Sequence, residues 1–276
     1  MTPLDGVRVL DLTRVLAGPF CTMMLGDMGA DVVKVEEPQS GDEVRHWAPV
    51  VEGWSSYFVG VNRNKRSVAL DLKSAEGKAA LEALVRWADV LVENLRPGTL
   101  ARLGFGYDRC RDLNPRLIYC SISGYGQTGP KRHLPGYDVV IQGEAGVMDV
   151  NGQPEAPPTR MGLAMTDYLA GLYAMQGILL ALRVREQQGH GQFVDVALFD
   201  SMLSALTLPA GILCSTGLPP KRLGNDHPSI APYETLQAAD GSIVVAVGNQ
   251  RLWRRFCDVL DRPDLFDDPR FRSNAL

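Results

Sequence analysis

The sequence predicts an α/β protein with a mostly parallel sheet, because short apolar runs alternate with segments in which apolar residues recur at helical spacing. The first unit of this kind comprises a strand over 7–12, a helix over 20–28 and a strand over 31–36. Gly29 ends the helix between the two strands. Short connections of this sort are typical of a right-handed βαβ unit. The alternation then repeats, which extends the prediction to a Rossmann-like large domain.

Later segments repeat this pattern at similar spacing. We predict strands over 89–93, 117–123 and 193–197, and helices over 75–87, 168–187 and 198–208. The helix over 168–187 is too densely apolar for a surface helix, and its small residues, such as Gly171, Ala174 and Gly177, suit close packing. We therefore expect this helix to be buried in the large domain.

The composition changes towards the C-terminal end. Glycine, proline and basic residues over 217–230 predict a linker. Two apolar segments around a turn at 239–241 then indicate a β-hairpin, followed by a helix over 250–260. We predict a large domain over 1–216 and the beginning of a smaller α+β domain over 231–276, a stretch too short to close a core of its own comfortably.

Charge and cysteine usage narrow the class of protein. The 276 residues carry a net charge of −4, and the scatter of lysine and arginine along the chain argues against a nucleic-acid partner. The five cysteines form no C-x-x-C pair and the four histidines lie in predicted loops, so we expect neither disulfides nor a metal site. The start of the chain lacks a signal-peptide pattern, and no run approaches the roughly 18 apolar residues of a membrane span. We therefore expect a cytoplasmic protein without a membrane partner.

Glycines over 124–129 form the pattern G-x-G-x-x-G directly after a predicted strand. A dinucleotide site needs an apolar helix behind this pattern, but Pro130 and three basic residues follow here. We therefore favour a loop that borders a site, because glycine lets the backbone approach a ligand closely. No G-x-S-x-G motif accompanies the pattern, so a serine hydrolase lacks its nucleophile.

Asp167 is the most informative residue for function. It lies where a turn of small residues gives way to the helix over 168–187. There the positive end of the helix dipole and unpaired backbone N–H groups favour the charged carboxylate and orient it, as a nucleophile requires. The alternative interpretation is an ordinary helix cap, which is the commoner role of an aspartate at such a position.

Short motifs in a fixed order extend over nearly the whole chain. They lie at 4–11, 17–19, 25–36, 64–67, 70–73, 89–94, 124–126, 136–138, Asp167 and 189–192. Any single motif is weak, but their order and spacing are specific. With them the chain resembles the class III CoA-transferases, the family of formyl-CoA transferase.

The resemblance implies that Asp167 is the catalytic residue. Its carboxylate would attack the thioester of a donor acyl-CoA to give a mixed anhydride and CoA thiolate, and exchange would proceed through aspartyl-CoA and a second anhydride. Water must be kept from such a site, because anhydrides hydrolyse readily. Coenzyme A is then a substrate together with a small carboxylic acid, and no cofactor stays bound.

The resemblance also implies which residues hold coenzyme A. Val15, Leu16 and Ala17 match the slot for its pantetheine arm. The segments that hold its nucleotide and phosphates are matched by Leu70, Asp71, Leu72, Lys73, Asn94, Leu95, Arg96 and Arg102, with Lys73 and Arg102 as cations. Formyl-CoA transferase has basic residues where this chain has Glu37 and Pro135. Lys131 or Arg132 is the expected substitute for the second of these.

Tyr137, followed by Asp138, separates two activities within the family. The α-methylacyl-CoA racemases have histidine before this aspartate, because moving a proton across a carbon needs a base on each face. Tyrosine side chains, with an ordinary pKa near 10, are poor bases at neutral pH, so transferase is favoured over racemase. The segment over 223–233 lacks the glycine run of formyl-CoA transferase and is more similar to the succinyl-CoA-using members that act on dicarboxylates.

Family members form interlocked homodimers, and their chains continue well beyond position 276 to complete the large domain. The resemblance therefore implies that this chain is shortened at its C-terminal end relative to the family. A non-catalytic CoA-binding fragment is accordingly the alternative from another class of function.

Overall fold

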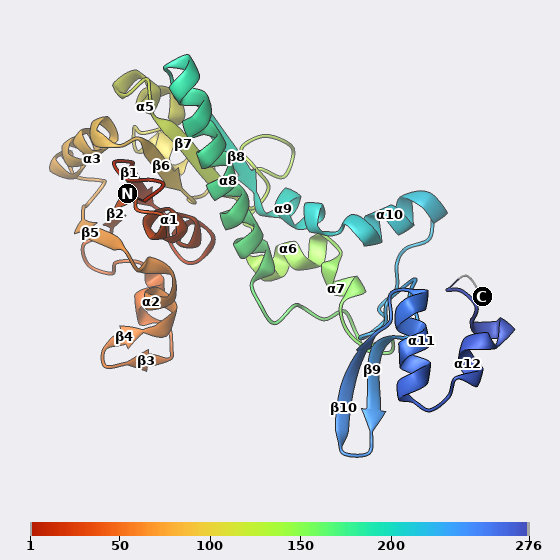
Figure 1. Ribbon diagram of the computed structural model, residues 1–276. Coiled ribbons are helices and arrows are strands. Elements are labelled where there is room, and N and C mark those ends of the chain that lie inside the picture. The colour runs from red at the N-terminus through yellow and green to blue at the C-terminus, as the bar shows by residue number, and fades with distance from the viewer. Residues whose placement is uncertain (1, 275–276) are drawn as a thin grey trace. The chain divides into compact units, whose positions relative to one another are not determined.

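The computed structural model describes residues 2–274, which form two compact units (Figure 1). The first unit comprises the chain up to residue 145 together with 161–207, and the second combines 146–160 with the chain from 208 onwards. The sequence prediction instead places 146–160 in the large domain and ends that domain at 216. The main-chain N–H of Gly224 donates to the carbonyl oxygen of Gly152 (2.9 Å), which joins the two segments of the second unit directly.

Six parallel strands form the sheet of the first unit, in the order β5-β2-β1-β6-β7-β8. Their bounds are β1 (Arg8–Leu12), β2 (Asp31–Glu36), β5 (Lys65–Ala69), β6 (Val90–Glu93), β7 (Ile118–Ser123) and β8 (Phe193–Ala197). Every neighbouring pair is parallel, which confirms the predicted α/β fold with a parallel sheet. The apolar pattern does not predict β5, because lysine, arginine and serine occupy its first positions.

Helices cover both faces of this sheet (Figure 1). The helices α1 (Ala17–Asp27) and α8 (Met165–Gln188) lie on one face, and α3 (Ala75–Trp87), α4 (Thr99–Arg102) and α5 (Tyr107–Leu113) lie on the other. Because side chains alternate along a strand, Leu10 and Leu91 join the core beside α3. Val9 and Val90 point to the opposite face, where they are fully buried.

Helix α8 is half-buried rather than buried on all sides. Ala170, Ala174 and Ile178 are fully buried, whereas Leu172 and Leu180 are 42% and 61% exposed in this chain. The expectation of a buried helix is therefore wrong, because apolar residues also occupy the outer face. At 24 residues α8 is long and apolar enough to cross a bilayer, which the count of apolar runs missed. In the first unit it packs instead along β7, β8 and α1.

Smaller elements complete the first unit. Between β2 and β5 lie a 3-10 helix η1 (Glu43–His46), the short strands β3 (Val50–Val51) and β4 (Trp54–Ser55), and α2 (Ser56–Asn62). Beside α8 lie α6 (Asp138–Glu144) and α9 (Leu198–Ala205). The helix predicted over 198–208 ends at Ala205, because Pro209 has no N–H for the Ala205 carbonyl group and its ring would collide with that group. A separate helix, α10 (Thr207–Thr216), follows.

The second unit contains an antiparallel hairpin of β9 (Tyr233–Ala238) and β10 (Gly241–Ala246), then α11 (Gln250–Val259), α12 (Asp264–Asp267) and a 3-10 helix η2 (Pro269–Phe271). The hairpin and the helix that follows it confirm the predicted order of elements here. The earlier segment contributes α7 (Val147–Val150), and Asp149 in that helix forms an ion pair with Arg222 (2.8 Å).

Candidate active site

A cavity of about 300 Å³ lies beyond the carboxyl ends of β1, β6 and β7. Open α/β sheets bind ligands at this edge, because parallel strands bring the loops that follow them together there. Nine of the residues that the resemblance assigns to the site line the cavity: Val15, Leu16, Ala17, Asn94, Leu95, Arg96, Tyr137, Asp138 and Asp167. The fold thus gathers Asp167 with segments that are distant from it in the sequence.

A second cavity of about 340 Å³ adjoins the first, since Arg14 and Leu95 line both. Four of the five remaining residues of the predicted site line it: Leu70, Asp71, Leu72 and Lys73. Arg102 lines neither of these cavities. Its guanidinium donates a hydrogen bond to the hydroxyl oxygen of Thr99 (3.0 Å), and Thr99 lines the second cavity. Arg102 is exposed and contacts the second cavity only through Thr99.

Neither of the two positions at which the family has a cation supplies one here, and Pro135 lines the first cavity. Glu37 lines the second cavity, but its carboxylate accepts hydrogen bonds from the main-chain N–H and the hydroxyl group of Ser40 (both 2.8 Å). Lys131 pairs with Glu144 and, like Arg132, lines neither cavity, so the expected substitution stays a prediction that these cavities do not support. Cations that do line the two cavities, and suit an anionic ligand, are Arg14, Arg96 and Lys73. Within residues 2–274 no three His, Cys, Asp or Glu side chains gather as metal ligands.

Asp167 lies in the first turn of α8, half-buried in the wall of the first cavity. Burial raises its pKa from 3.8 to about 7, and the charge of Asp138 adds to this effect. The prediction that helix N–H groups keep this carboxylate charged is wrong. No hydrogen bond from the part of the chain that the structure describes reaches it, so nothing offsets the cost of its burial.

Asp138, the first residue of α6, takes the capping role that the sequence suggests for Asp167. Its Oδ1 accepts hydrogen bonds from the main-chain N–H (3.0 Å) and the hydroxyl group (2.7 Å) of Thr166. Its Oδ2 accepts a hydrogen bond from Gln142 Nε2 (2.8 Å). The starts of α6 and α8 are therefore joined through Asp138, and the carboxylate of Asp167 is left to the cavity.

Two glycines in contact bring Tyr137 and Asp138 to the end of β7. A Cβ atom on Gly124 would lie 2.7 Å from the Cα of Gly136, and one on Gly136 would lie 2.4 Å from the Cα of Gly124. Any side chain at either position would force the two backbones apart. Gly124, from the glycine pattern over 124–129, thus lines the first cavity through a close backbone contact.

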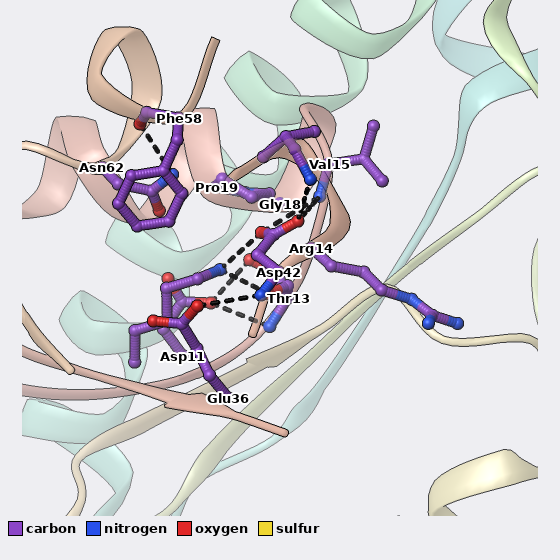
Figure 2. A network of polar contacts seen from close by, with 12 residues as sticks. Asp11, Thr13, Arg14, Val15, Gly18, Pro19, Glu36, Asp42, Phe58 and Asn62 are labelled. Carbon is purple, nitrogen blue, oxygen red and sulfur yellow. Dashed lines mark hydrogen bonds and ion pairs between the residues drawn. The ribbon is translucent and has the colours of Figure 1, made fainter. Parts of the chain in front are cut away.

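Buried charges that the sequence analysis missed surround the loop between β1 and α1 (Figure 2). Lys65 pairs with Asp11 (3.0 Å) and Lys34 pairs with Asp42 (3.0 Å), and each of these four side chains is at most 2% exposed. Burial acts to raise the pKa of Asp11, but the two lysines and two threonine hydroxyl groups outweigh it and lower the pKa to about 2. The sequence signal was Lys34 itself, a lysine between the valines of β2, and in the sheet Lys34 lies opposite Asp11 of β1.

Val15 holds a strained conformation in the same loop. Its φ of 68° lies in the left-handed region, which costs a residue with a side chain roughly 1–2 kcal/mol. Its main-chain N–H donates to both carboxylate oxygens of Asp42 (3.2 and 3.3 Å). The main-chain N–H of the neighbouring Arg14 donates to Asn94 Oδ1 (2.9 Å), and Asn94 Nδ2 donates to the main-chain carbonyl oxygen of Arg14 (2.8 Å). Two other segments therefore fix this part of the cavity wall.

Glu93, the last residue of β6, is a second carboxyl group with a raised pKa. Burial raises it to about 7, although the Ser121 hydroxyl group and the main-chain N–H of Leu95 (2.8 Å) donate hydrogen bonds to it. Gln127 Nε2 in turn donates to Ser121 Oγ (2.7 Å). Glu93 thus anchors the 94–97 segment of the cavity wall.

Known proteins are similar to this chain in both sequence and fold. The chain matches the model of CoA-transferase family III over residues 4–276. It is 45% identical to a succinate–glutarate CoA-transferase of Agrobacterium fabrum and 45% identical to an acetyl-CoA:oxalate CoA-transferase of Acetobacter aceti. Each alignment covers 99% of this chain and 70% of the relative.

The fold is similar to the crystal structure of a CAIB/BAIF family protein from Brucella suis. The TM-score is 0.88 at 44% identity, over 99% of this chain and 73% of that chain. These findings confirm the resemblance inferred from the motifs, and the chain belongs to CoA-transferase family III.

Proposed function

We propose that this protein transfers coenzyme A from an acyl-CoA to a carboxylic acid through a covalent intermediate on Asp167. The observation that carries the proposal is a half-buried carboxylate that accepts no hydrogen bond from residues 2–274 and lies in a cavity that arginines line. A carboxylate without stabilising donors stays reactive, and burial shields an anhydride from water. Both relatives are named as CoA-transferases, which supports the reaction in general.

In the proposed reaction a carboxylate oxygen of Asp167 attacks the thioester carbonyl carbon of the donor. The carbon–sulfur bond breaks, CoA thiolate leaves and a mixed anhydride remains. The thiolate then attacks the aspartyl carbonyl carbon, which releases the donor acid and leaves a thioester on Asp167. The acceptor carboxylate displaces the thiolate to form a second anhydride. Attack of the thiolate on the acceptor's acyl carbon releases the new acyl-CoA and restores the carboxylate of Asp167.

The charge state of Asp167 determines the pH range in which this reaction can begin. A carboxylate must be ionised to attack, and a pKa of about 7 leaves roughly half of the Asp167 side chains ionised at neutral pH. Asp138 contributes to this raised pKa while it holds the start of α8. The pair therefore has divided roles, with Asp138 as the structural anchor and Asp167 as the nucleophile.

We propose succinyl-CoA as the donor and a second dicarboxylic acid as the acceptor. One relative is named for succinate and glutarate, and the other for acetyl-CoA and oxalate, so three of the four named acids are dicarboxylic acids. A dicarboxylate keeps one charged group while the other reacts. Arg14 and Arg96 line the cavity of Asp167 and supply guanidinium groups, which suit a carboxylate in two-point contact.

The proposed state of the protein is a homodimer in the cytoplasm. The five free cysteines support a reducing compartment, and the exposed Leu172 and Leu180 of α8 support association. Analytical ultracentrifugation should give the mass of two chains. A single-chain mass combined with coenzyme A binding but no exchange would favour the non-catalytic fragment instead.

The test of the covalent step uses succinyl-CoA with glutarate, oxalate or mesaconate as acceptor, followed by mass spectrometry of the CoA thioesters. Hydroxylamine added during turnover should convert Asp167 to a hydroxamate that peptide mapping locates. Asp167→Asn should show neither product, and Asp149→Asn, the same change at an exposed site in the second unit, should behave as the unchanged protein does. Full exchange by Asp167→Asn would contradict the mechanism.

A further inference from the structure

The conformation of Val15 requires an explanation, because a valine occupies a left-handed position where glycine is the usual residue. The residue lies between β1 and α1 and lines the cavity of Asp167. A branched side chain returns to the extended region unless its neighbours prevent it. The surroundings of its main-chain N–H therefore decide whether this part of the wall keeps its shape.

Asp42 is the group that holds this N–H (Figure 2). Its two carboxylate oxygens lie 3.2 and 3.3 Å from the nitrogen of Val15. One of them is 3.0 Å from Lys34 Nζ, and both side chains of this ion pair are 1% exposed. The main-chain N–H of Asp42 donates to Glu36 Oε2 (2.9 Å), which fixes the residue itself.

Lys34 contacts both the loop that holds Val15 and the carboxylate of Asp42. Its ammonium group donates to the carbonyl oxygen of Thr13 (2.6 Å), two residues before Val15, while it pairs with Asp42. One buried cation thus connects the residue that begins the turn with the carboxylate that holds Val15. A charge pair of this kind often stabilises a fold no more than apolar residues of the same volume would, so stability alone does not account for it.

We propose that Asp42 is a positioning residue, which holds Val15 in its left-handed conformation and thereby sets the Val15–Leu16–Ala17 wall of the cavity for acyl-CoA. The proposal rests on the proposed function for its substrate. Asp42 acts through the amide of Val15, and it makes no contact with the reacting atoms. Glycine at position 15 would adopt the same conformation without strain, so it should make the wall independent of Asp42.

The experiment is a double-mutant cycle of Asp42→Asn and Val15→Gly, read out as the dissociation constant of free coenzyme A by calorimetry. The asparagine has one acceptor oxygen, and when that oxygen stays beside Lys34 the amide NH2 group takes the place of Oδ1, which accepts from the N–H groups of Val15 (3.2 Å) and Val44 (3.3 Å). We expect Asp42→Asn to weaken binding about tenfold in the unchanged protein and less than about threefold in the Val15→Gly background, a coupling typical of residues in contact. Equal losses in both backgrounds would overturn the proposal, because a direct contact of Asp42 with coenzyme A predicts that result.

Asp89→Asn is the matched control for stability. Asp89 pairs with Arg8 and Arg185 (both 3.1 Å) at the amino end of β6, and it lines neither cavity. Its loss should lower the melting temperature while coenzyme A binds as before. If Asp89→Asn weakens coenzyme A binding as much as Asp42→Asn does, loss of stability explains both and the positioning role is refuted.

Hydrogen exchange of the unchanged protein gives a readout that needs no variant to fold. The amide of Val15 should exchange as slowly as the amides of β1, and fast exchange at that amide would refute the hydrogen bond to Asp42. Failure of the proposed function has a different signature, which is coenzyme A binding without acyl exchange in the unchanged protein. If coenzyme A binds but no acyl exchange occurs, the double-mutant cycle still tests the role of Asp42. If coenzyme A does not bind at all, the hydrogen-exchange rate of the Val15 amide tests it.

Discussion

Asp11 and Asp167 both lie within the first unit, yet they are in opposite electrostatic states. Asp11 is fully buried, and although burial opposes its charge, Lys65, Lys34 and two hydroxyl groups lower its pKa to about 2. Asp167 is half-buried, and burial together with the charge of Asp138 raises its pKa to about 7. Partners, rather than depth, therefore decide whether a buried carboxyl group is charged.

The charged carboxylate of Asp11 stabilises the folded state, whereas the charged carboxylate of Asp167 destabilises it. Hydrogen bonds and cations occupy the oxygens of Asp11, so its charge belongs to the folded state. For Asp167 the shift from 3.8 to about 7 corresponds to at most about 4 kcal/mol against the charged form in the folded chain. The lack of hydrogen-bond donors that makes the charged form of Asp167 unfavourable is also what the proposed role as a nucleophile requires.

The largest expected effect follows from Asp167→Asn. Exchange should fall by at least about a thousandfold, since the attacking oxygen is lost. The free energy of unfolding at pH 8 should rise, because the variant removes a charge that the fold disfavours. The raised pKa means that the folded chain binds the proton more tightly, so this gain should vanish as pH falls from 7 towards 4. Urea titrations across that range measure it, and a less stable variant at pH 8 would contradict the comparison.

Asp11→Asn should have the opposite effect on stability. It leaves Lys65 buried without its counter-charge, which we expect to lower the free energy of unfolding by about 3–5 kcal/mol in urea titrations at pH 7. The lowered pKa of Asp11 predicts that this contribution persists above pH 4 and is lost as pH falls through about 2. Asp27→Asn, which breaks the more exposed ion pair with Arg63, is the control and should cost less than about 1 kcal/mol. Equal losses would mean that burial of the Asp11 pair does not matter.

Asp138→Asn should shift the pH dependence of exchange without abolishing exchange. In the unchanged protein the rate should rise with pH through about 7, as Asp167 loses its proton. The asparagine keeps an acceptor for the Thr166 N–H but removes the neighbouring charge, so the midpoint should move to lower pH. It should stay above 4, because burial, the larger cause, remains. A midpoint that does not move would show that Asp138 does not act on Asp167 through its charge.

Glu93→Gln should have the smallest effect. The neutral amide resembles the protonated form that a pKa of about 7 favours below neutrality, so the stability at pH 5 should change by no more than about 0.5 kcal/mol. At pH 8 the variant should be the more stable protein, since it avoids a buried charge. Thermal unfolding at the two pH values tests this, and a large loss at pH 5 would show that Glu93 is ionised in the folded chain.

The sequence predicted the sheet and much of the cavity because their signals are local. The limits of β2, β8 and α3 match those read from the apolar pattern. The loops after β1 and β6 meet Asp167 at one cavity because parallel strands end at a common edge.

The remaining features depend on partners that are distant in the sequence. The raised pKa of Asp167 depends first on its burial in the cavity wall and then on the charge of Asp138, which caps the helix from another segment. The role of Lys34 depends on the register of β1 against β2, which places it beside Asp11. A lysine in an apolar strand was visible, but its buried partner Asp42 follows only from the fold.

The distribution of cations also protects the protein from its own substrates. Acyl thioesters and anhydrides modify neutral amines, and a lysine beside Asp167 would compete with the acceptor acid for each acyl group. Arg14 and Arg96 supply the positive charge among the described residues of that cavity, and guanidinium groups stay protonated and unreactive at neutral pH. Lys34 and Lys65 are buried and held in ion pairs with Asp42 and Asp11. Repeated turnover should therefore leave few acylated amines near the site.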